Sequence, residues 1–159
     1  YSFGILQSVV HWKWFLDRCS TLKGDYRYTS ITVFDTFAWP QAPTVVQARA
    51  VAKTAVELRS LRNKIMQERS WSLRDLYRTL ETPGSNPLRD AHEALDEAVR
   101  AAYGMKKNAD PLAFLLELNH QVAEREGQLL PVTGPGLPPC VKDPKPFITD
   151  DCIRVGNED

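Results

Sequence analysis

The strongest constraint on the fold is a series of helix start and stop signals between residues 44 and 127. Asn86-Pro87 and Asp110-Pro111 each place a capping side chain before a proline, and a glycine closes each stretch that follows. A capping oxygen accepts an N–H that the first helical turn leaves unpaired, proline suits the first turn, and glycine releases the chain at the end. The predicted helices run over residues 72–81, opened by Ser72, over 87–103 and over about 111–126.

A longer helix is predicted before them, from Thr44 to about Arg69, where neither glycine nor proline occurs. Apolar residues recur along this stretch at helical period and share one broad arc. Short connections between consecutive helices favour antiparallel neighbours. The expected fold is therefore mainly α: an antiparallel helical bundle, with a short extended or β segment near the N-terminus and an irregular proline-rich C-terminal tail.

Residues 3–17 also predict a helix, with apolar side chains distributed almost all the way around it. Such a helix needs partners on every face. We therefore expect residues 1–17 to be the least self-sufficient part, with Trp12 and Trp14 covered by a neighbouring molecule or by the bundle. Residues 18–30 predict an exposed loop, and the β-branched and aromatic residues of 28–39 predict a short extended stretch.

Composition divides the chain into residues 1–42, 43–127 and 128–159. The run PQAP at 40–43 ends the first part, and a high density of proline and glycine after Gly127 prevents regular structure in the last. This tail either lies across the bundle as a linker-like extension or is an unfolded end.

Charge and cysteine content exclude some classes of protein. The 20 basic and 20 acidic residues leave no net charge, so any basic surface must be local. The three cysteines are widely spaced, with no CxxC pair and no histidine at metal-ligand spacing, which predicts free thiols, no metal site and a cytoplasmic protein. No apolar run approaches the roughly 20 residues that a membrane helix needs.

The sequence contains none of the common catalytic motifs: no P-loop, GxGxxG, GxSxG or HExxH. His11 and His92 lie among apolar or aromatic residues and are expected to be hydrogen-bonded core histidines rather than functional ones. Asn119 is expected to be a buried hydrogen-bonding residue for the same reason.

Two arginines of the long helix, Arg59 and Arg62, project into its apolar arc, where an unpaired charge would be costly. We expect them to pair within the molecule. A secondary contact with DNA phosphate is the alternative.

A second basic group lies in the predicted loop. Its cations can neutralise phosphates or contact guanine edges, its hydroxyls can bond backbone oxygens, and Gly24 permits close approach. Asp25 can contact a base or orient a cation. The candidate DNA-binding residues are Arg18, Ser20, Thr21, Lys23, Asp25 and Arg27.

Two segments of this chain resemble a known family. FGILQSVVHWKWF followed by LKGDYRYTSITVFDTFAWP resembles the end of the target-recognition domain of MmeI-like, type IIG/IIL restriction-modification adenine-specific DNA methyltransferases. That domain has the pattern GxLxSxxHxxW, then DxRYSxxxVxxTFPWP, from which Ala38 departs. The segment from SLRDLYRTL to FLLELN is similar to the family's helical C-terminal domain. Together the resemblance covers about residues 2–125.

The resemblance implies a function for each part of the chain. Residues 1–42 would be the end of a DNA target-recognition domain, 43–127 the helical C-terminal domain and 128–159 a tail. The implied partners are double-stranded DNA and the remaining domains of a bacterial parent enzyme, with no membrane. The alternatives are a structural or protein-interaction helical domain without DNA contact, or an independent small enzyme.

The family's catalytic parts are absent from this sequence. Members transfer a methyl group from S-adenosylmethionine to adenine, and many carry a nuclease, using a glycine-rich cofactor loop and an (N/D)PP(Y/F) motif. The nearest string, Asn86-Pro87-Leu88-Arg89, lacks the second proline and the aromatic residue. We therefore expect no catalysis and no cofactor in this chain, with S-adenosylmethionine bound elsewhere in the parent.

Overall fold

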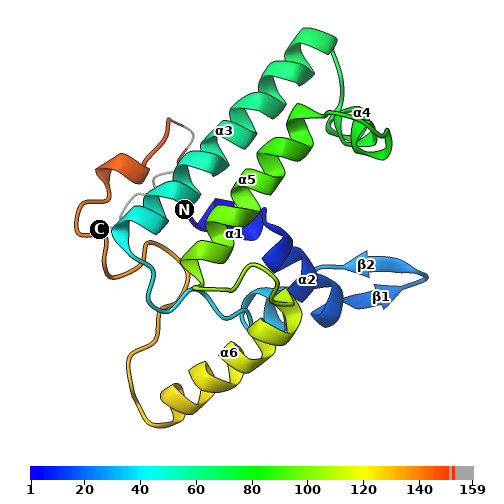
Figure 1. Ribbon diagram of the computed structural model, residues 1–159. Coiled ribbons are helices and arrows are strands. Elements are labelled where there is room, and N and C mark those ends of the chain that lie inside the picture. Colours follow the sequence, from blue (N-terminus) through cyan, green and yellow to red (C-terminus); the bar gives the residue numbers. More distant parts are fainter. Residues whose placement is uncertain (151, 153–159) are drawn as a thin grey trace, which may run out of the picture.

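The computed structural model describes residues 1–150 and 152, so the end of the expected tail, 151 and 153–159, lies outside the described residues. The mainly helical fold class is confirmed (Figure 1). In chain order the elements are α1 (Ser2–Leu6), α2 (Val9–Arg18), β1 (Ser20–Leu22), β2 (Asp25–Arg27), the π-helical η1 (Ser30–Phe34), α3 (Val45–Arg69), α4 (Leu73–Arg78), the 3₁₀ turn η2 (Thr79–Glu81), α5 (Pro87–Ala102), α6 (Pro111–Gly127) and the 3₁₀ turn η3 (Lys145–Phe147).

The helix starts between residues 44 and 111 are where the sequence predicts them. Thr44 caps α3 and Ser72 caps α4, each in a reciprocal capping box with the residue three positions on. The Asn86 side chain accepts the amides of residues 88 and 89, and that of Asp110 accepts the amide of residue 113. Local capping chemistry therefore fixes these ends.

The core lies between α3 and α5, which run antiparallel and side by side (Figure 1). Val51 and Leu58 of α3 and Leu95 and Val99 of α5 are fully buried there. The short α1 packs on α3 at Gly4, where an added Cβ would lie 2.9 Å from Val51 Cγ1. The N-terminal helix α1 therefore packs as part of the bundle.

The single helix predicted over residues 3–17 is wrong, because the chain breaks at Gln7 and Ser8 into α1 and α2. Ser8 has an extended backbone, and its Oγ donates to the Ile5 carbonyl at 2.7 Å and accepts the His11 amide at 3.5 Å. One serine thus ends the first helix and caps the second.

The bundle covers only part of the apolar surface of these two helices. Ile5, Val10 and Trp14 are fully buried within the chain, and Trp14 Nε1 donates to the Val33 carbonyl at 3.1 Å. Trp12 remains 51% exposed. The bundle therefore covers Trp14, as expected, but leaves Trp12 about half uncovered.

The extended stretch predicted over residues 28–39 is also wrong, because residues 30–34 form the π-helical η1 and the strands lie earlier, at 20–27. Phe37 and Trp39 are buried beside this turn. Bonds from the helices hold the segment: Tyr103 Oη donates to the Ala38 carbonyl at 2.8 Å, and Asn119 Nδ2 donates to the Thr36 carbonyl at 2.7 Å. Asn119 is thus a hydrogen-bonding residue, as predicted, although it is only half-buried.

The proline-rich tail is docked where the structure describes it. Gln41 and Thr133 exchange hydrogen bonds, from Gln41 Nε2 to the Thr133 carbonyl at 3.0 Å and from the Thr133 amide to Gln41 Oε1 at 2.9 Å. Ser2 Oγ donates to the Gly136 carbonyl at 3.0 Å. The alternative of a linker-like extension lying across the bundle is therefore correct for this segment.

Candidate nucleic-acid interface

The residues predicted to form an exposed loop form a β-hairpin that projects from the end of α2, away from the bundle (Figure 1). β1 and β2 pair antiparallel, with Ser20 opposite Arg27 and Thr21 opposite Tyr26. The two turn residues, Lys23 and Gly24, have φ of +52° and +90°. Positive φ at both positions matches the twist of a two-residue hairpin turn. Lys23 is therefore at the tip.

The pairing sorts the candidate residues by face. Residues opposite each other in a ladder project to the same side, and neighbours along a strand alternate. Ser20, Asp25 and Arg27 therefore share one face, whereas Thr21 lies on the other. All four side chains are exposed. The structure thus brings together three of the predicted residues and separates Thr21 from them.

Arg18 stands at the base of the hairpin, as the last residue of α2. Its Nε lies 3.1 Å from Asp17 Oδ2, and its guanidinium carbon lies 4.7 Å from the centre of the Trp14 ring. These contacts orient the guanidinium beside an exposed surface.

Aromatic contacts fix the hairpin to α2. Phe15 stacks on Tyr28, with ring centres 5.6 Å apart, and meets the edge of Tyr26 at 6.1 Å. Tyr28 Oη lies 3.2 Å from His11 Nε2. Burial lowers the pKa of His11 to about 4, so its ring is neutral at pH 7. The prediction of a hydrogen-bonded core histidine is confirmed at His11.

The two arginines of α3 have different surroundings. Arg62 is 8% exposed, and its Nη1 donates to Gln7 Oε1 at 3.0 Å and to Tyr77 Oη at 3.1 Å. Arg62 is therefore hydrogen-bonded within the molecule, as expected, and the alternative of a phosphate contact is wrong for this residue. Tyr77 Oη also lies 2.8 Å from His92 Nε2, which makes His92 a hydrogen-bonded, partly buried histidine.

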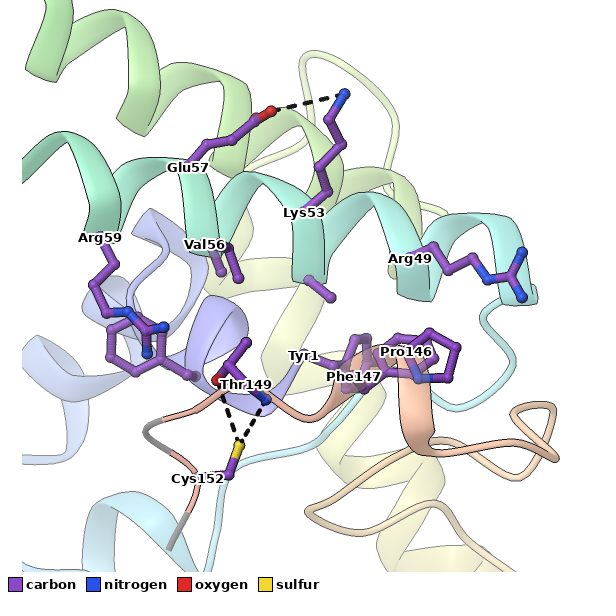
Figure 2. Close-up of a pocket in the computed structure, with 13 residues that line it drawn as sticks. Tyr1, Arg49, Lys53, Val56, Glu57, Arg59, Pro146, Phe147, Thr149 and Cys152 are labelled. Atoms are coloured by element: carbon purple, nitrogen blue, oxygen red, sulfur yellow. Dashed lines mark hydrogen bonds and ion pairs between the residues drawn. The ribbon is translucent and has the colours of Figure 1, made fainter.

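Arg59 lines a hollow of about 880 Å³ between α3 and the tail (Figure 2). Phe147 of the tail closes one side of this hollow, and Lys53 and Glu57 of α3, which form an ion pair, also line it. In Figure 1 the tail and the hairpin lie at opposite ends of the molecule. Arg59 is therefore not part of the hairpin surface.

An aromatic groove of about 820 Å³ runs between α2 and the turn that follows α4. Its apolar lining includes Trp12, Phe15 and Leu80. Asp96 is the charged residue of its lining, which contains neither lysine nor arginine. Because phosphate would meet a carboxylate and no cation here, the groove is unsuited to the nucleic-acid backbone.

Comparison with known proteins places both parts of the chain. The model of the MmeI target recognition domain matches residues 1–41, and that of the MmeI C-terminal domain matches residues 44–125. The chain belongs to the MmeI family. The hairpin and its base lie wholly within the part that matches the MmeI recognition domain, and α3 to α6 lie almost wholly within the C-terminal match.

Two similar proteins extend this result. DNA methyltransferase A of Bacillus subtilis (strain 168) is 32% identical over 130 residues, which are 79% of this chain and 14% of that protein. A structure of the type IIL restriction-modification enzyme MmeI in complex with DNA matches with a TM-score of 0.62 and 30% identity, over 77% of this chain and 16% of that one. The chain therefore spans about one seventh of the length of these relatives.

No helix in residues 1–150 is long and apolar enough to cross a membrane. No group of three or more His, Cys, Asp or Glu side chains in that part of the chain could hold a metal ion.

Sequence reasoning missed the residues that hold the hairpin's supporting helix. These are Gln7 and Tyr77, which both accept from Arg62, and Asp96, which accepts the Val9 amide; the bonds join positions 15 to 87 apart in the chain. No local pattern marks such pairs. Tyr28 has a weak local signal, because residues two apart in an extended segment, such as Tyr26 and Tyr28, project to the same face.

Proposed function

We propose that this chain is the DNA-recognition and accessory helical region of a bacterial restriction-modification methyltransferase. Residues 1–42 form the end of its target-recognition domain, 43–127 its helical C-terminal domain and 128–159 a tail. The observation that carries the proposal is an exposed hairpin, braced by the bundle, within the match to the MmeI recognition domain. Double-stranded DNA is the proposed partner of this hairpin.

Charge supports the hairpin as the DNA-facing element. The whole chain has no net charge, whereas residues 18–27 carry three cations, Arg18, Lys23 and Arg27, and one anion, Asp25, for a net charge of +2. Local positive charge attracts the phosphate backbone even when the protein as a whole is neutral.

The three cations have different proposed roles. Lys23, a flexible point charge at the hairpin tip, suits phosphate. Arg18 and Arg27 carry planar forks that can donate two bonds to a guanine edge. Ser20 and Asp25 share the face of Arg27 and can contact bases or orient its guanidinium, while Thr21 on the opposite face suits a backbone oxygen. Arg59 is kept only as a secondary phosphate contact.

The methyl donor proposed for the parent is S-adenosylmethionine, bound outside this chain, and the proposed product is N6-methyladenine in DNA. The similarity to a DNA methyltransferase supports this activity for the parent. The proposed location is the cytoplasm, where such an enzyme meets its DNA.

The remaining domains of the parent are the proposed partners of the aromatic groove, because it is apolar and unsuited to phosphate. In the intact parent, a Trp12→Cys variant should then resist alkylation, whereas Leu129→Cys, at a position 94% exposed in this chain, should react. Equal reaction at both positions would argue against this partner.

Replacing Lys23 with alanine tests the phosphate role. Losing one phosphate contact should weaken binding of the intact parent to all DNA sequences alike and lower the slope of log K against log salt by about one. The measurement is fluorescence anisotropy with cognate and unrelated duplexes across a salt series. Lys142→Ala, in the tail, is the matched control and should leave the slope unchanged. An unchanged slope for Lys23→Ala would remove this residue from the interface.

A further inference from the structure

The helix that carries the hairpin is anchored at its other end by a carboxylate from the C-terminal domain. The Val9 amide, the first of α2, donates to Asp96 Oδ1 on α5 at 2.7 Å, across 87 positions of the chain. At the far end of α2, Arg18 is followed after one residue by β1. Any change in the direction of α2 therefore moves the hairpin.

The chemistry of a helix N-terminus explains this contact. The first amides of a helix have no partner within it, and the aligned peptide dipoles make this end positive. The Ser8 side chain accepts the His11 amide, and Asp96 supplies a partner for the Val9 amide and a negative charge beside the positive end. Burial raises the pKa of Asp96, while the bond from Val9 opposes that rise. A partly buried carboxylate is costly unless such bonds compensate it.

A second hydrogen bond from the C-terminal domain reaches the chain just before α2. Arg62 of α3 donates to Gln7, two residues before α2 begins, and Tyr77 of α4 holds the same guanidinium nitrogen. Three helices of the C-terminal domain thus converge on Gln7 and Val9. Their polar contacts fix where α2 starts, whereas apolar contacts alone would leave it able to slide.

We propose that Asp96 is a positioning residue for DNA recognition: by capping α2 from the C-terminal domain, it sets the direction in which the hairpin meets DNA. This inference rests on the proposed function. It makes the C-terminal domain a determinant of specificity through a residue that does not itself touch DNA.

The test compares Asp96→Ala and Asp96→Asn in the intact parent. Asp96→Ala should weaken binding to the cognate duplex about tenfold, in line with the loss of one hydrogen bond to a charged group, and change binding to unrelated duplexes much less. Asparagine keeps an oxygen that can accept the Val9 amide, so Asp96→Asn should restore affinity to within about threefold of the original. Glu97→Ala, the exposed neighbour on α5, should match the original protein.

Hydrogen exchange separates positioning from general loss of stability. In Asp96→Ala the Val9 amide should exchange faster, while the central amides of α3 and α5 keep their rates. Faster exchange throughout the bundle, or an Asp96→Asn variant no better than Asp96→Ala, would overturn the proposal. A variant with Arg18, Lys23 and Arg27 all changed to alanine distinguishes the two failures: if it binds like the original protein, the proposed function fails; if it loses binding while Asp96→Ala does not, the anchor alone fails.

Discussion

Replacing Trp14 with alanine is expected to lower the free energy of unfolding by about 3–5 kcal/mol, the largest effect on stability foreseen here. Trp14 is fully buried, packs near Phe37 and has the guanidinium of Arg18 over its ring. Its loss leaves a cavity and deprives the Val33 carbonyl of its donor. Urea unfolding of this chain, followed by circular dichroism, measures the change.

Trp12→Ala is the matched control, since it removes the same side chain from the same helix at a position 51% exposed. It should cost clearly less stability than Trp14→Ala. Equal losses from the two variants would show that α2 does not pack in the orientation described.

Replacing Arg27 with alanine is expected to cost the intact parent about 1–3 kcal/mol of discrimination, confined to one base position. Arg27 lies on the exposed hairpin face opposite Ser20 and beside Asp25, where a planar fork can reach a base edge. Arg27→Lys should retain most of the affinity for unrelated DNA but lose the discrimination, because lysine is a point charge. Binding to the cognate duplex and to its single-base variants measures this.

A uniform loss across all duplexes would instead make Arg27 a phosphate contact. No loss with either variant would make it an ordinary surface charge.

The helices from residue 44 onward could be predicted because their ends depend on neighbours in the sequence. Thr44, Ser72, Asn86 and Asp110 cap amides no more than three positions away. The break at Ser8 depends on the same chemistry but was missed, because apolar residues continue on both sides of it and outweigh one serine in a periodic pattern.

The predicted extended stretch lies too far along the chain, because burial of side chains, and not β propensity, determines the conformation of residues 28–39. Phe37 and Trp39 are buried against the helices, and the turn of the chain at η1 directs them there. The hairpin has one local signal, Gly24, because glycine readily adopts the positive φ of a tight turn. Lys23, the other turn residue, also has positive φ, but a lysine gives no such signal because it adopts that conformation only at some energetic cost.

The candidate site could be predicted in composition but not in arrangement. The cations and hydroxyls of residues 18–27 are visible in the sequence, whereas their division between two faces depends on the register of Ser20 with Arg27. The anchor between Val9 and Asp96 joins positions 87 apart and follows only from the packing of α2 on α5.

DNA contact by the hairpin is tested by measuring DNA binding of the intact parent with Arg18, Lys23 and Arg27 all changed to alanine. A control variant carries Lys53, Lys142 and Lys145 changed to alanine, which alters the net charge equally away from the hairpin. If the hairpin contacts DNA, the first variant loses both cognate affinity and sequence discrimination, while the control retains discrimination and differs little in affinity. Equal affinity, salt slope and discrimination for the two variants would show that the hairpin does not contact DNA and would favour a helical region without DNA contact.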